Sequence, residues 1–149
     1  MLETFAQGDY DRSRRLTLRA LIGVGPRFLL FRTSAWEAAL GTAYMFEHEE
    51  LDLPAAAIHP AETDAHRWSS YVTVQGRAGD RLATVVTVYA QPRLDAFADV
   101  RMLGDARLAV QLVGALALQV SGFLRWDGRP PDGTDELDMT LKTGVGIEW

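Results

Sequence analysis

Three histidines lie among carboxylates in the first half of the chain, and this combination could bind a metal. They are His48, His59 and His66. Imidazoles and carboxylates together are common ligands of zinc and of other catalytic metals. Their spacing matches no fixed ligand pattern such as His-Glu-x-x-His. We therefore predict no metal ligand and no cofactor, although a small metal-dependent enzyme that uses the loop from His59 to His66 stays an alternative.

Nucleophilic catalysis has no complete motif in this chain. Ser69, Ser70 and Ser121 lie in no Gly-x-Ser-x-Gly turn, and the glycine-bearing stretches lack the ending of a phosphate-binding loop. The absence of cysteine excludes thiolate metal sites, cysteine nucleophiles and disulfides. The sequence predicts no catalytic residue, and we expect a protein that is not an enzyme.

The acidic run "EHEELD" is the best candidate for contact with a partner. We predict that its carboxylates bind a basic protein, because complementary charge speeds and orients association. The net charge of −5 and a single lysine argue against nucleic acid as a partner. The predicted contact residues are Glu47, Glu49, Glu50 and Asp52.

Two helices are expected to position these residues. Ser34 and Glu37 match a capping box at the start of "SAWEAALGTAYMFEHEE", which predicts a helix there. The stretch "LAVQLVGALALQVSGFLRWDG" predicts a long helix over Asp105–Ser121, apolar nearly all round and therefore covered on more than one side. It falls short of the roughly 20 apolar residues of a membrane span. We expect a buried helix, no membrane contact, and a possible homodimer through this helix.

Strands are expected elsewhere. "RWSSYVTVQGRAGDRLATVVTVYAQP" predicts a β-hairpin of Trp68–Gln75 and Arg81–Ala90. "RLTLRALIGVG" favours a strand, while a helix over Asp9–Leu21 stays open. Gly25-Pro26 predicts a turn before "RFLLFR", and "MTLKTGVGIEW" supplies a last strand.

The fold class that follows is α+β. The chain of 149 residues is long enough for one globular domain, residues 1–149, with a mostly antiparallel sheet packed by one long apolar helix and a shorter helix. Leu112, Leu116 and Val120 are the predicted core of the long helix. No secretory signal is visible at the N-terminus, so we expect a cytoplasmic protein.

One resemblance concerns the second half of the chain. The hairpin, then "PRLDAFADV", then "LAVQLVGALALQVSGFLRWDG" resembles the layout of bacterial polymorphic-toxin immunity proteins. The resemblance implies a protein that neutralises a cognate toxin by binding it, and it assigns no functional residue. The alternative to such an immunity-like inhibitor is an oligomerising structural subunit of a phage or secretion assembly.

Overall fold

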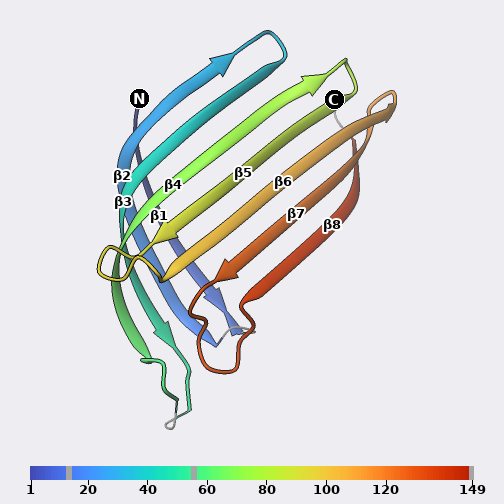
Figure 1. Ribbon diagram of the computed structural model, residues 1–149. Helices are drawn as coiled ribbons and strands as arrows, with labels where there is room; N and C mark the ends of the chain where they lie inside the picture. Colours follow the sequence, from blue (N-terminus) through green and yellow to red (C-terminus); the bar gives the residue numbers. More distant parts are fainter. Residues whose placement is uncertain (13–14, 55–56, 148–149) are drawn as a thin grey trace.

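A single antiparallel sheet of eight strands makes up the structure (Figure 1). The computed structural model describes residues 1–12, 15–54 and 57–147. Each strand pairs with its neighbours in the chain, so the order in space is β1 to β8 without a crossover. The strands are β1 Leu2–Asp11, β2 Leu16–Arg32, β3 Trp36–Leu51, β4 Glu62–Ala78, β5 Leu82–Pro92, β6 Val100–Val113, β7 Leu116–Asp127 and β8 Leu137–Ile147. Among the described residues, no helix is long and apolar enough to cross a membrane.

The α+β prediction was wrong, because both expected helices are strands. The capping-box segment forms a turn after Thr33, whose hydroxyl accepts the N–H of Trp36, and continues as β3. The long apolar segment Asp105–Ser121 is divided between β6 and β7 by a turn at Gly114, where φ is +57°. Its leucines and valines alternate with smaller or polar residues, which is the period of a strand. The alanines in this segment and its continuous apolar character had favoured the helix.

The N-terminal segment is a strand, as its alternation favoured, and the helix over Asp9–Leu21 does not form. The turn expected at Gly25-Pro26 is absent. Instead, β2 runs through both residues, and its pairing with β3 continues at Arg27 and Gly41. The first hairpin is therefore made by β1 and β2, and the second strand expected at "RFLLFR" is the end of β2.

The central hairpin is confirmed. It is formed by β4 and β5, which pair from Ser70–Ala90 to Ala78–Leu82 around a turn that includes Gly79, with φ +63°. β4 begins earlier than expected, at Glu62, so His66 lies in a strand and not in a loop. The expected last strand is β8, and residues 148 and 149 lie outside the described part.

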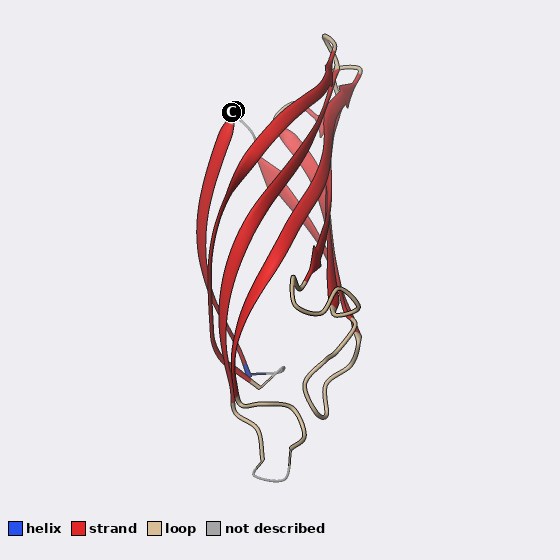
Figure 2. Cartoon of the chain, turned by 60° about the vertical axis from the view of Figure 1, so that its left-hand side comes forward, coloured by secondary structure: helices blue, strands red, loops and turns tan. Residues whose placement is uncertain are grey.

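The sheet is curved like a half-open cylinder, with its strands inclined to the long axis (Figures 1 and 2). Glycines on the concave side of β2 and β3 favour this bend, because they leave room where the sheet is tightest. A Cβ at Gly41 would lie 2.0 Å from the ring of Tyr71, and one at Gly23 would lie 2.3 Å from the ring of Phe5. Both aromatic rings thus take the space that these glycines leave.

The two ends of the curved sheet differ. At one end the strands are joined by short turns, residues 33–35, 79–81 and 114–115. At the other end lie the longer connections 52–61, 93–99 and 128–136, which appear together at the bottom of Figure 2. We call these the turn end and the loop end.

Candidate functional site

The two faces of the sheet carry different chemistry. Because directly paired residues of antiparallel strands point to the same side, the strand registers assign each side chain to the convex or the concave face. Val72 on β4 opposes Val88 on β5, for example, and the next pair, Thr73 and Thr87, points to the other side. The convex face is apolar, whereas the concave face carries the buried charged side chains together with both polar and apolar ones.

The convex side chains of β2–β8 form a continuous surface that we call the apolar band. Many of its members are substantially exposed: Val72 is 44% exposed, Val88 47% and Leu141 71%. No charged side chain interrupts the band among the described residues. Its members include Ile22, Val24, Phe28, Leu40, Tyr44, Phe46, Trp68, Val72, Val74, Val86, Val88, Met102, Leu108, Val110, Leu112, Leu116, Leu118, Val120, Leu124, Trp126, Leu137, Met139, Leu141, Val145 and Ile147.

This placement corrects the predicted core. Leu112 and Leu116 are 43% and 38% exposed, and both belong to the apolar band together with the half-buried Val120. They had been expected inside, on one face of a helix. As residues of strands, they point away from the concave side, where the most buried residues of the protein lie.

Charged groups are buried on the concave face near the loop end. Glu47 on β3 is 2% exposed and lies between three arginines. Arg19 on β2 donates through Nη2 to Oε2 at 2.5 Å, and Arg101 on β6 donates through Nη1 to Oε1 at 2.8 Å. Arg67 on β4 places Nε 3.5 Å from Oε1. One carboxylate thus connects three strands besides its own.

Further acids complete this group. Asp127 on β7 accepts a hydrogen bond from Arg101 Nε at 2.8 Å, and Asp99 forms an ion pair with Arg67 at 3.3 Å. Glu49 lies 3.5 Å from Arg101. Removal of charges from water is costly unless each has several partners, and this arrangement provides them. We call Arg19, Glu47, Glu49, Arg67, Asp99, Arg101 and Asp127 the ion-pair cluster.

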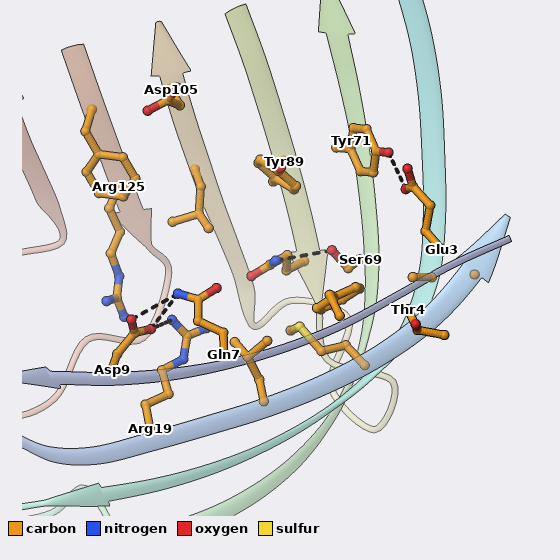
Figure 3. A pocket seen from close by; sticks show the side chains of 18 of the residues that line it. Glu3, Thr4, Gln7, Asp9, Arg19, Ser69, Tyr71, Tyr89, Asp105 and Arg125 are labelled. Atoms are coloured by element: carbon orange, nitrogen blue, oxygen red, sulfur yellow. Dashed lines mark hydrogen bonds and ion pairs between the residues drawn. The ribbon is translucent and has the colours of Figure 1, made fainter. Parts of the chain in front are cut away.

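A cavity of about 1260 Å³ adjoins this cluster on the concave side (Figure 3). Its lining is mixed. Tyr71 donates its hydroxyl hydrogen to Glu3 at 2.5 Å, and Gln91 donates to Ser69 at 3.2 Å. Figure 3 shows Glu3, Ser69, Tyr71 and Tyr89 directed into the space between β1 and the central strands. Leu21, Met45, Leu103 and Phe123 contribute the apolar part of the lining.

The four predicted partner-binding acids are not on one surface. Glu47 and Glu49 point to the concave side and are buried in the ion-pair cluster. Glu50 is on the convex side beyond the apolar band, 3.3 Å from His48. Asp52 follows β3 and is exposed. Their part in binding a protein stays a prediction, and only Glu50 and Asp52 are accessible for it.

The three histidines are separated as well. His48 contacts Asp64 at 2.7 Å, His66 contacts the Tyr44 hydroxyl at 2.5 Å, and His59 contacts the Pro60 carbonyl. Within the described ranges, no three histidine or acidic side chains are grouped to hold a metal ion.

Sequence reasoning missed the arginines of the ion-pair cluster. The available signal was an arginine at a concave position in each of β2, β4 and β6, in strands whose other face is apolar.

The chain belongs to a family described as "Protein of unknown function, DUF481", whose model matches residues 1–149. No curated protein and no solved structure matches the chain. The family description gives no positive indication of catalysis.

Proposed function

We propose that this member of the family is an integral membrane protein whose strands cross a lipid bilayer. The convex face contacts lipid, and the concave face lines a polar, hydrated compartment. The observation that carries the proposal is the apolar band, which extends over β2–β8 without a charged side chain among the described residues. Alternation of apolar outward and polar inward residues is the pattern of strands that cross a membrane.

The height of the band supports this proposal. On β6 the convex positions run from Met102 to Leu112 without a charge, a length of about 33 Å at the usual rise of a strand. Strands in membranes are tilted by roughly 40°, which reduces the span to about 25 Å, the height of the apolar zone of such proteins. The band is therefore tall enough to cross the hydrocarbon layer.

Aromatic side chains near the loop end of the band support it further. Tyr44 opposes Trp68 toward the loop end, and Trp126 opposes Met102 toward the same end. Tyrosine and tryptophan favour the boundary between lipid and water, because each has an apolar ring and a polar group. Past these aromatics, the convex positions become polar, with His48 in contact with Asp64.

The alternative is that a protein partner covers the band. The largest apolar patch on a soluble monomer is usually a few hundred Å², and a band over seven strands exceeds this. An oligomerising subunit, or an inhibitor bound to its toxin, would need to bury the whole curved face. The cytoplasmic location expected from the sequence is compatible with this alternative and not with a protein that crosses a bilayer. Lipid covers a convex surface of any curvature, so we favour the membrane proposal over a protein partner.

Flotation with lipid vesicles tests the proposal. Protein refolded in the presence of phospholipid vesicles should rise with them in a density gradient and stay with them after an alkaline carbonate wash. Protein that remains at the bottom of the gradient, and is monodisperse in buffer without detergent, would overturn the proposal.

Two adjacent positions provide a matched comparison. Val86 points to the convex side, and its neighbour Thr87 points to the concave side, where its hydroxyl contacts Thr73 at 2.9 Å. Val86→Lys should reduce the floating fraction, because a lysine near the middle of the bilayer costs roughly 2–4 kcal/mol. Thr87→Lys should float as the unmodified protein does. Equal flotation of both variants would contradict the assignment of the faces.

A further inference from the structure

The cavity on the concave face is lined by more acidic side chains than basic ones. Five carboxylates and two arginines border it. One of these arginines, Arg19, contacts Glu47 at 2.5 Å, and the other, Arg125, contacts Asp127 at 3.3 Å. Neither of the two contacted acids belongs to the lining. The arginines thus share their charge with the ion-pair cluster, and the described lining keeps an excess of negative charge.

Two tyrosine rings form a wall of the cavity beside some of these carboxylates. Tyr71 and Tyr89 lie directly opposite each other on β4 and β5, and their ring centroids are 5.2 Å apart. Figure 3 shows them on neighbouring strands next to Asp105, with Glu3 reaching Tyr71 from β1. Faces of aromatic rings attract cations, and carboxylates nearby add to the attraction. This wall is therefore suited to a cationic ligand.

Asp105 is the carboxylate of this wall that a ligand can reach at least cost. Its side chain is 34% exposed, and it lies 3.1 Å from Nε of Arg107, whose side chain is 72% exposed. Ion pairs between exposed side chains contribute little to stability, because water and salt screen them. A cationic group of a ligand can therefore replace Arg107 beside Asp105.

A buried acceptor in the same lining lacks a donor. Gln91 is 6% exposed, and its Nε2 donates to Ser69 Oγ at 3.2 Å. Its Oε1 is buried and has no hydrogen-bond partner within the described ranges. Buried polar atoms of folded proteins are nearly always hydrogen-bonded. The acceptor therefore points to a ligand that carries an N–H donor.

These groups lie at three successive levels along the cavity. Asp105 is paired with Thr87 on β5, and Tyr89 and Gln91 follow at alternate positions of that strand. Each level is therefore about 7 Å from the next at the usual rise of a strand. The groups that attract a cation or an N–H donor are spread along a line, which suits a chain of amines better than a compact ion.

We propose that this cavity binds a linear polyamine, a chain of ammonium groups joined by short methylene segments. One ammonium group pairs with Asp105, and the next lies against the rings of Tyr71 and Tyr89. An N–H group further along the chain donates to Gln91 Oε1. The cavity of about 1260 Å³ has room for such a chain, and its apolar lining contacts the methylene segments. The inference does not rest on the membrane proposal, because the cavity and the apolar band are on opposite faces of the sheet.

Isothermal titration calorimetry with spermine tests this inference. The full-length protein is held in dodecylmaltoside micelles, which are uncharged, and a titration into empty micelles is subtracted. Spermine should bind saturably. Tetraethylene glycol, a neutral chain, should show no binding, and Mg²⁺ should bind at least about tenfold more weakly than spermine, because a compact ion cannot contact several levels at once.

Three variants locate the binding. Asp105→Asn should weaken spermine binding about tenfold, since it removes a charged hydrogen-bond acceptor. Tyr89→Leu keeps an apolar side chain but removes the ring, and it should weaken binding about threefold. Asp64→Asn is the matched control, because it removes a carboxylate from the convex side, where Asp64 contacts His48, and it should leave the affinity unchanged. Circular dichroism checks that each variant keeps its β-sheet.

Two sets of results would overturn the inference. Equal losses in Asp105→Asn and Asp64→Asn would show only a general attraction between charges, and equal affinities for spermine and Mg²⁺ would exclude a chain of amines as the preferred ligand. The absence of saturable spermine binding in protein that floats with vesicles would overturn the inference and leave the membrane proposal standing.

Discussion

Arg101 and Glu47 are joined by a hydrogen bond of 2.8 Å although two strands, β4 and β5, separate their own strands in the sheet. In a flat sheet the strands β3 and β6 would be about 14 Å apart. The contact therefore depends on the curvature, and it connects the two sides of the concave face. Both side chains are buried, with 3% and 2% of their surface exposed, respectively.

Removal of Glu47 should destabilise the fold strongly. Glu47→Ala leaves Arg19, Arg67 and Arg101 close together without their shared carboxylate, and loss of one member of a buried ion pair typically costs about 3–5 kcal/mol. Urea unfolding in detergent micelles measures this cost. Glu50→Ala is the control, because Glu50 has one partner on the convex surface and its loss should cost under about 1 kcal/mol. Similar midpoints for the two variants would show that the cluster does not stabilise the curved sheet.

The sequence allowed the strands with clear alternation to be predicted. The hairpin of β4 and β5 was found because valine and threonine alternate on both sides of a glycine-containing turn. β6 and β7 were missed although Leu108, Val110 and Leu112 alternate in the same way. The residue between Leu108 and Val110 is Ala109, which points to the concave face and is also apolar. The sequence therefore looked hydrophobic on both faces, and a buried helix fitted it equally well.

The candidate site was harder to predict than the strands. Glu47 and Glu49 were singled out as an exposed acidic run, and the arginines that surround them come from β2, β4 and β6. The residues in these contacts are 20 to 54 positions apart in the sequence, so no local sequence pattern indicates that they meet. The contacts follow only from the order of the strands and the curvature of the sheet. The apolar band could have been found by testing each apolar stretch for a period of two before testing it for a helix.

Tryptophan fluorescence should report a shallow position for the native rings. Trp68 and Trp126 lie toward the loop end of the apolar band and Trp36 begins β3 at the turn end, so these three rings are near the two boundaries that we place between lipid and water. The fourth tryptophan, Trp149, lies outside the described residues. Lipids brominated near the headgroup should therefore quench the native emission more than lipids brominated near the chain end. A tryptophan added by Val86→Trp should show the opposite preference. The membrane proposal fails if neither lipid quenches either protein.

The turn end and the loop end should lie on opposite sides of a vesicle membrane. Ile58 belongs to a loop and is 94% exposed, and Asp80 belongs to a turn at the other end. Ile58→Cys and Asp80→Cys each provide one thiol for a membrane-impermeant maleimide. Each molecule exposes only one of its two ends on the outside of the vesicle, where the reagent can reach it. The labelled fractions of the two variants should therefore add up to about one, whatever the proportion of the two orientations in the membrane. Full labelling of both variants would contradict a transmembrane arrangement.

Acid should loosen the contact between two loops at the loop end. Asp132 accepts hydrogen bonds from the backbone N–H groups of His59, at 2.8 Å, and Ile58, at 2.6 Å. These two bonds, that of His59 first, lower the pKa of Asp132 from its ordinary value of 3.8. A carboxyl whose pKa is lowered by folding stabilises the structure above its unfolded pKa and ceases to do so as the pH falls through its folded pKa.

The backbone N–H groups of Ile58 and His59 should therefore be protected from hydrogen exchange at neutral pH and should lose that protection only as the pH falls below about 3.8, the ordinary carboxyl value. Asp132→Ala removes the acceptor of both hydrogen bonds. In this variant the N–H groups of Ile58 and His59 should exchange faster at neutral pH, and acid should cause no further loss of protection through this contact. Exchange at the buried strand position Met45 serves as the internal reference, because this residue has no exposed surface. An acid step of the same size in Asp132→Ala would assign the loosening to another group.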